Sequence, residues 1–288
     1  MKTIGMIGIG MMGHGIATNL AKHGYPLVLF DHPGNQPLDA LRAAGAVTVA
    51  DAAELASRVD ALILVLTGSP QIEAVLTGAG GVVQGLRPGT VVIDCSTALP
   101  DSTLRMAEAV QAAGGRFLDA PMTRTPKEAA EGRLNLLVGG DAGLLEACRP
   151  LLKCFAENIT HVGPVGAGHS MKLLHNYVSI GMVTLLAEAA ACAQQRDVAP
   201  QAFVEVLAQG GGGGIALERM RPYLLNGDLS AFRFAIANAA KDLGYYTAMA
   251  EATGARKEIA ATVLGSLEDA LARAGSQALM PELVSLMR

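Results

Sequence analysis

The chain has no tryptophan, and aromatic residues make up only 4% of its 288 residues. With so few rings, a stacking platform for nucleic-acid bases is not expected. Basic residues are not in excess either, because 22 lysines and arginines face 26 aspartates and glutamates, for a formal net charge of -4. The composition therefore offers no general basic face, and we expect no nucleic-acid partner.

Cysteines and long apolar runs are also scarce. The four cysteines, at positions 95, 148, 154 and 192, show no Cys-x-x-Cys spacing and no histidine pairing typical of zinc, so we expect no metal site. We interpret them as reduced core residues of a cytoplasmic protein. The longest apolar run follows Tyr177 and is broken at positions 179, 184 and 188, so no membrane association is expected. Glycines at positions 5, 8, 10, 13 and 15 fit a tight turn better than a signal peptide.

A dinucleotide-binding pattern opens the chain. Thr3–Ile7 reads as a β-strand, and a G-x-G-x-x-G sequence follows it and opens a helix over Met12–Lys22. In this pattern the first glycine permits a tight turn, the second lets the backbone approach a pyrophosphate, and the third lets the helix pack against the strand. The helix N-terminus supplies amide donors to the phosphates. We expect the cofactor to be contacted by Gly8, Gly10, Met11, Met12 and Gly13.

The second strand, Leu27–Phe30, ends in Asp31, about 20 residues beyond the glycines. A carboxylate at this position bonds the ribose hydroxyls of NAD and repels the 2′-phosphate of NADP. The alternative is a glycine-rich turn with an exposed aspartate. We expect NAD as the cofactor and NADP as the less favoured one, since a protonated His32 could tolerate the phosphate.

Strands and helices alternate as far as residue 162, with further strands predicted at 47–49, 61–66, 91–94, 117–121 and 134–138. The segment 61–66 is apolar throughout, as expected of a parallel strand buried on both faces. Beyond residue 162 only helical patterns follow. We therefore predict an α/β fold with an N-terminal Rossmann doubly wound sheet over residues 1–162. Residues 163–288 are predicted to form an all-α domain for substrate binding and oligomerisation.

Ligands of open α/β sheets bind at the carboxyl ends of the strands. Leu66 ends one predicted strand, and Ser96 and Thr97 follow another, so we expect all three to reach the cofactor. A turn that leads into a helix cap is the alternative for Ser96 and Thr97, and the two roles are compatible.

The loop after the strand at 117–121 contains Thr123, Arg124 and Thr125. A guanidinium placed directly after a strand presents a fork to a planar anionic group, so we expect this loop to bind substrate. The alternative is a solvated loop arginine, whose surface pairs contribute little.

The segment 166–192 organises the chain. A Gly-Ala-Gly break precedes a long apolar run with helical spacing, and we predict one helix over about residues 169–193 that joins the two domains. Lys172 and Asn176 lie four residues apart and share one face of it. A helix this apolar is expected to be buried, and buried lysines are rare unless paired or functional. We interpret Lys172 as a catalytic acid/base; a lysine snorkelling to solvent is the alternative.

Four motifs occur in order: the glycine-rich segment 8–24, Asp119-Ala120-Pro121 with Gly132 downstream, Gly166-x-Gly168-x-x-x-Lys172-x-x-x-Asn176, and Lys241-Asp242-Leu243. In this order they resemble the β-hydroxyacid dehydrogenases, which include 3-hydroxyisobutyrate dehydrogenase and tartronate semialdehyde reductase. The resemblance covers essentially the whole chain. It implies Lys172 as acid/base, Asn176 as its partner in holding substrate, and Lys241 near the cofactor.

The chain departs from this family in two places. The family usually has Ser-Gly-Gly where this chain has Thr123-Arg124-Thr125. The Arg-Thr pair is similar to that of sulfolactaldehyde reductase, whose corresponding loop grips a sulfonate. His175 replaces the first of two asparagines that are common in the family, and we expect it to contact substrate.

The expected reaction is hydride transfer between NAD(H) and a small anionic 3-hydroxy acid, or hydroxy-sulfonate, and its semialdehyde. The preferred substrates are similar to sulfolactaldehyde and dihydroxypropanesulfonate, or to 3-hydroxyisobutyrate. Two alternatives stay open, namely an NAD(P)-binding sensor or scaffold without catalysis and a relative of the imine reductases. Because the interdomain helix is too apolar to be solvated, we also expect a homodimer or homotetramer.

Overall fold

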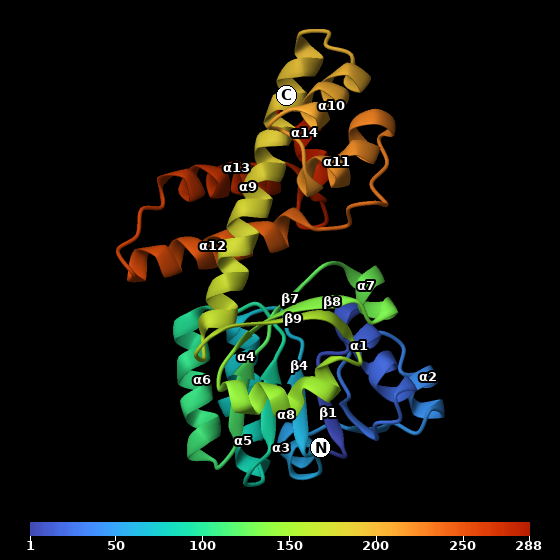
Figure 1. Cartoon of the computed structure of the whole chain (residues 1–288), viewed down its shortest axis with the longest axis vertical. Helices are drawn as coiled ribbons and strands as arrows, with labels where there is room; N and C mark the ends of the chain where they lie inside the picture. The colour runs from blue at the N-terminus through green and yellow to red at the C-terminus, as the bar shows by residue number, and fades with distance from the viewer. The chain divides into compact units, whose positions relative to one another are not determined.

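A computed structural model describes residues 1–288 and divides them into two compact units, Met1–Lys172 and Leu173–Arg288. The first unit holds all the strands of the chain (Figure 1). They are β1 (Ile4–Ile7), β2 (Leu27–Phe30), β3 (Val47–Val49), β4 (Ala61–Leu64), β5 (Val91–Asp94), β6 (Arg116–Asp119), β7 (Met122–Thr123), β8 (Leu134–Gly139) and β9 (Ala156–Gly163).

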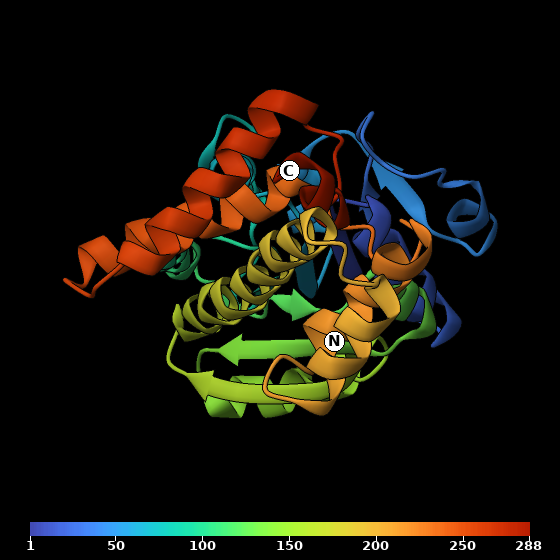
Figure 2. The ribbon, with the colours of Figure 1, turned by 90° about the horizontal axis from the view of Figure 1, so that it is seen from above.

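The strands form one sheet in the order β3-β2-β1-β4-β5-β6-β8-β7, with β9 paired to β8. The six strands β1 to β6 run parallel, in the order of a doubly wound dinucleotide-binding fold. Beyond β6 the sheet becomes mixed, since β8 is antiparallel to β6 and β9 lies parallel beside β8 (Figure 2). The Rossmann architecture predicted from the sequence is confirmed.

Helices cover both faces of this sheet because its central strands are apolar on both sides. Ile4 and Met6 of β1 belong to a core cluster with Leu20 and Leu145, whereas Ile7 belongs to the opposite cluster. The helices of this unit are α1 (Met11–Lys22), α2 (Asp39–Ala43), α3 (Ala52–Ser57), α4 (Ser69–Thr77), α5 (Val82–Gly85), α6 (Pro100–Ala112), α7 (Pro126–Glu131), α8 (Ala142–Leu152) and the start of α9 (Ala167–Gln195).

The second unit is helical and has its own buried core, which includes Ile180, Leu217, Leu243 and Leu267. After the rest of α9 it contains α10 (Pro200–Gln209), α11 (Ile215–Asn226), α12 (Ile236–Ala252), α13 (Glu258–Ala274), a 3-10 turn η1 (Met280–Glu282) and α14 (Leu283–Leu286). Helix α12 continues through the polar pair Lys241-Asp242, and Asp242 is buried.

Helix α9 is less buried than its composition suggests. Leu173, Ile180 and Val183 are buried, but an apolar stripe on α9 is exposed. This stripe consists of Met171, Leu174, Val178, Met182 and Leu185. By length and mean hydropathy α9 is also a candidate membrane span, although the core helix of a soluble protein passes the same test. The expectation of burial on all sides is therefore wrong for the single chain.

Candidate active site

Tight backbone packing explains two of the three motif glycines between β1 and α1. A Cβ at Gly8, whose φ is +92°, would lie 2.1 Å from the Val65 carbonyl oxygen, and one at Gly13 would lie 2.0 Å from that of Gly8. A Cβ at Gly10 would meet no atom within 4 Å. The packing of the protein itself therefore does not require glycine at position 10. A glycine at this position, at the N-terminus of a helix, leaves room for a pyrophosphate to approach the backbone.

Asp31 lies directly after β2, where a ribose-binding carboxylate is needed. Its Oδ2 is 3.2 Å from Nη2 of Arg42, and both side chains are about half exposed. Asn35 ties this loop to the glycine-rich turn, because its Oδ1 accepts a hydrogen bond from the Ile9 amide at 3.2 Å. The carboxylate is therefore placed beside a cation that could serve a phosphate if the carboxylate were absent.

Asp31→Ser is expected to shift cofactor preference from NADH toward NADPH by about 10–100-fold, because charge-assisted hydrogen bonds contribute about 1.5–3 kcal/mol. The variant removes the repulsive carboxylate and releases Arg42 for the 2′-phosphate. The ratio of kcat/KM for the two cofactors measures the shift. In the double variant Asp31→Ser/Arg42→Ala the gain for NADPH should disappear, and an unchanged ratio in Asp31→Ser would contradict this role of Asp31.

The carboxyl ends of β4 and β5 are joined through Ser96. The Ser96 hydroxyl accepts a hydrogen bond from the Leu66 amide at 2.9 Å, and the Ser96 amide donates to Oδ1 of Asp94 at 3.0 Å. Ser96 and Asp94 are buried, while Leu66 and Thr97 are partly exposed. The structure therefore brings Leu66 and Ser96 together at the sheet edge where ligands of such folds bind.

The start of α9 is fixed by the carboxylate of Asp119 at the end of β6. Its Oδ1 accepts from the amide of Gly166 and its Oδ2 from the amide of His169, both at 2.8 Å. These amides lack partners within the helix, and the helix dipole favours an anion there. Gly168 allows the close approach, because a Cβ on it would lie 2.5 Å from the Leu137 carbonyl oxygen. Gly168 and Asp119, both motif residues, therefore fix the start of α9 against the end of β6.

Lys172 lies in the second turn of α9 and is half-buried. Its ammonium donates a hydrogen bond to the Met122 carbonyl oxygen at 2.8 Å. Met122 is in β7 and directly precedes the Thr123–Thr125 loop. The structure therefore anchors the predicted acid/base next to the predicted anion-binding loop.

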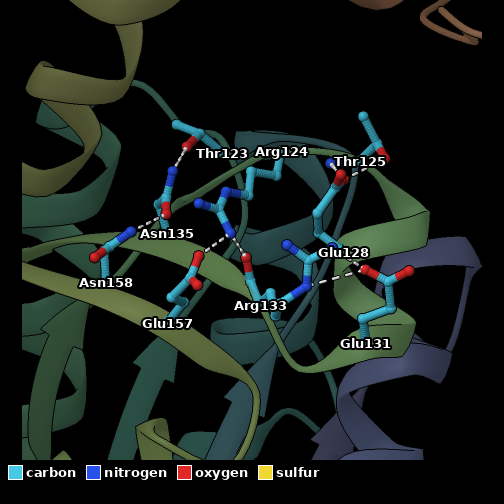
Figure 3. Close-up of polar contacts among 9 residues, drawn as sticks. All are labelled: Thr123, Arg124, Thr125, Glu128, Glu131, Arg133, Asn135, Glu157 and Asn158. Atoms are coloured by element: carbon cyan, nitrogen blue, oxygen red, sulfur yellow. Dashed lines mark hydrogen bonds and ion pairs between the residues drawn. The ribbon is translucent and has the colours of Figure 1, made fainter.

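Arg124 has a left-handed backbone, with φ of +83°. Its Nη1 donates to the Arg133 carbonyl oxygen and to Oε2 of Glu157 on β9 (Figure 3). The arginine side chain is 25% exposed, so it is not a freely solvated loop residue. Both bonds use Nη1, which leaves the edge formed by Nε and Nη2 outside this contact.

The two threonines beside Arg124 form different hydrogen bonds (Figure 3). Thr123 Oγ1 accepts from the Asn135 amide at 3.1 Å, so its hydroxyl proton can be donated elsewhere. The Thr125 side chain and amide form a capping box with Glu128 at the start of α7. Thr125 therefore has a structural role in shaping the loop, whereas Thr123 keeps a donor.

In the second unit, three predicted residues gather around Asp242 of α12. Oδ2 of this buried carboxylate accepts from Nδ2 of Asn176 at 2.6 Å, and Oδ1 lies 2.8 Å from the Lys241 ammonium. Nδ1 of His175 is 3.0 Å from Oδ1 of Asn176. Asp242 lies in the Lys241-Asp242-Leu243 motif, but no sequence pattern distinguishes it as a site residue.

Comparison with known proteins identifies two protein families that the chain matches. Residues 3–163 match the family described as the NAD binding domain of 6-phosphogluconate dehydrogenase. Residues 166–287 match the family described as NAD-binding of NADP-dependent 3-hydroxyisobutyrate dehydrogenase. Together the two matches span both structural units.

The relatives are dehydrogenases and reductases. The chain is 35% identical over 279 residues to an NAD-dependent L-serine dehydrogenase of Pseudomonas aeruginosa, covering 95% of this chain and 92% of that protein. It is 34% identical over 245 residues to the 3-sulfolactaldehyde reductase of Escherichia coli, with 85% and 82% covered. A solved structure of Mycobacterium tuberculosis 3-hydroxyisobutyrate dehydrogenase with L-serine superposes with a TM-score of 0.90 at 26% identity, with 100% and 99% covered.

Proposed function

The chain belongs to the 3-hydroxyisobutyrate dehydrogenase family of NAD-dependent oxidoreductases, and from this we propose that it interconverts a small anionic 3-hydroxy acid or hydroxy-sulfonate and its semialdehyde. The observation that supports this reaction is the bond from the Lys172 ammonium to the Met122 carbonyl, one residue before the Thr123–Thr125 loop. It sets a proton donor beside candidate anion ligands.

The residues of the first unit fit NAD. The N-terminus of α1 and the open side of Gly10 suit the pyrophosphate, and Asp31 suits the ribose hydroxyls. When bound, the nicotinamide supplies the hydride chemistry. The protein supplies the proton: the Lys172 ammonium donates it to the forming alkoxide in reduction, and the neutral amine accepts it in oxidation.

Asn176 follows Lys172 by one helical turn, and its amide has a defined orientation. Because Nδ2 donates to Asp242, Oδ1 is the acceptor of this amide, and its two lone pairs allow a bond in addition to the contact with His175. We propose that Oδ1 accepts from the substrate hydroxyl or from an ammonium. His175 and Lys241, which contact the same cluster, stay proposed contacts of substrate and cofactor.

Arg124 is the proposed ligand of the acid group. Glu157 and the Arg133 carbonyl hold Nη1, so the Nε and Nη2 edge can form the paired bonds that a carboxylate or sulfonate accepts. The Thr123 hydroxyl is the proposed additional donor. The names of the relatives suggest a compound with few carbons, such as sulfolactaldehyde, 3-hydroxyisobutyrate or L-serine.

Arg124→Ala is expected to lower kcat/KM for the best anionic substrate by about 10–100-fold, the value of a charge-assisted pair. The wild-type protein and the variant are assayed with NADH or NAD on sulfonate, carboxylate and phosphate semialdehydes, their alcohols and L-serine. Arg124→Lys keeps the charge without the fork and should recover little of the loss.

Glu157→Gln is the matched control, since it breaks the ion pair while keeping the guanidinium. A small, uniform loss in both variants on every substrate would mean that Arg124 only braces the loop against β9. If the wild-type protein turned over NADH with none of these compounds, an NAD-binding sensor would be favoured over the enzyme.

We also propose a cytoplasmic homo-oligomer, a dimer or tetramer, in which a second copy covers the apolar stripe on α9. The stripe residues recur every three or four positions and therefore share one face. The double variant Val178→Lys/Leu185→Lys is expected to give particles near the 29.6 kDa of one chain in light scattering. Val206→Lys, which changes an equally exposed apolar residue on α10, should keep the wild-type mass. A monomeric wild-type protein would contradict the proposal.

A further inference from the structure

His169 lies within the first turn of α9, and its ring is completely buried between two buried carboxylates. Its Nε2 is 3.9 Å from Oδ2 of Asp94 on β5, and its Nδ1 is 3.8 Å from Oδ2 of Asp119 on β6. On the side of α6, Nδ1 is 2.8 Å from Oγ1 of Thr103. These three side chains are the polar groups that face the ring, and neither the glycine-rich turn nor the Arg124 loop contains any of them.

The direction of the Thr103 hydroxyl proton decides which ring nitrogen carries a hydrogen. The hydroxyl lies 3.1 Å from the Leu99 carbonyl oxygen and 2.8 Å from Nδ1. When it donates to Nδ1, the hydrogen of a neutral ring is on Nε2 and faces Asp94; when it donates to the carbonyl, it acts toward His169 as an acceptor. Nδ1 must then carry a hydrogen. In a neutral ring Nε2 would be bare, and it has no hydrogen-bond partner although it is fully buried.

A bare Nε2 opposite an ionised Asp94 would place two acceptors face to face in the interior. Such an arrangement is costly, because buried polar groups need a donor. One proton on Nε2 or on Oδ2 removes the conflict, because one of the two groups is then a donor. Burial raises the pKa of Asp94, and a positive charge on the His169 ring beside it acts in the opposite direction.

We propose that His169 and Asp94 jointly hold one buried proton, and that this pair makes His169 a positioning residue for Lys172. The pair links two parts of the proposed site. Asp94 accepts from Ser96, which holds the Leu66 amide at the cofactor edge, and His169 precedes Lys172 by one helical turn. The positioning role rests on the proposed function of Lys172, whereas the shared proton does not.

The shared proton is tested on the unmodified protein by nitrogen-15 NMR of its histidine side chains between pH 5 and 9. His169→Gln identifies the signal by its loss. The expected result is that both ring nitrogens of His169 give the shift of a nitrogen that carries a hydrogen or accepts a hydrogen bond throughout this range. The shift of a bare, unbonded Nε2 at the upper end of the range would rule out the shared proton.

The positioning role is tested with His169→Gln, which can still donate toward Asp94 but cannot carry a charge. We expect kcat to fall by about 10–100-fold, as for other groups that orient an active residue, with KM for NADH within about twofold of wild type. The pH profile of kcat should also shift, because the variant lacks the ring that holds a proton one helical turn from Lys172. His23→Gln, at an exposed site, should change neither quantity.

The outcomes separate the two ideas. An unchanged kcat and an unchanged pH profile in His169→Gln would overturn the positioning role. A wild-type protein without turnover on any substrate would refute the proposed function, while the NMR result would still decide the shared proton. Asp94→Asn is the second variant if His169→Gln does not fold, and it should change the nitrogen-15 shift of Nε2 of His169, which faces position 94.

Discussion

Lys172→Ala is expected to lower kcat by about 10²–10⁴-fold, the usual contribution of a general acid or base. The affinity for NADH should stay at the wild-type value, because the residues proposed to hold its pyrophosphate and ribose belong to the turn after β1 and the end of β2. Stopped-flow turnover measures the first quantity and a fluorescence titration with NADH the second. The separation of the two effects identifies a group that acts on the reacting atoms.

A control is needed because the Lys172 ammonium also binds the Met122 carbonyl and could act only as a brace. Lys172→Met keeps most of the side-chain length and apolar packing but has no proton to give, so it should be as slow as the alanine variant. Lys153→Ala removes an exposed lysine of the same unit and should leave kcat unchanged. Turnover near the wild-type rate in Lys172→Met would exclude acid/base catalysis by this residue.

The parts of the fold that sequence reasoning predicted well have strong local signals. β2, β3 and β5 have the predicted bounds, since each is a short apolar run between turn residues. The places of the G-x-G-x-x-G turn between β1 and α1, of Asp31 after β2, and of Lys172 and Asn176 on α9 follow from spacing along the chain. Such patterns need no knowledge of what lies across the sheet.

The missed features depend on contacts between distant residues. β7 was predicted as part of a loop, and it is a strand because Met122 and Thr123 pair with β8. β9 carries a largely exposed, polar pattern, so it has little hydrophobic signal. Glu157 binds Arg124 from 33 residues away, and no spacing rule connects them. For the same reason the sequence does not separate His169 from any helical histidine, because only the fold brings Asp94 and Asp119 to its ring.

Gly13→Ala and Gly10→Ala are expected to fail in different ways, although both change the same motif. In Gly13→Ala the new Cβ would lie 2.0 Å from the Gly8 carbonyl oxygen. This is a backbone atom, so it cannot move away by a side-chain rotation. The cost should exceed the roughly 1–3 kcal/mol of ordinary overpacking, because the strand, turn and helix must separate. We expect a large fall in Tm, or no folded protein, and the loss of NADH binding with it.

In Gly10→Ala the new Cβ meets nothing within 4 Å, so Tm should stay near the wild-type value. The methyl group would instead stand between the backbone and a bound pyrophosphate. The NADH affinity should therefore fall by about 10–100-fold, the value of the charge-assisted bonds that are lengthened. Thermal melting and NADH titration of both variants test the contrast. Normal NADH binding by a stable Gly10→Ala protein would show that the cofactor does not approach this turn, because the protein's own packing gives no other reason for glycine there.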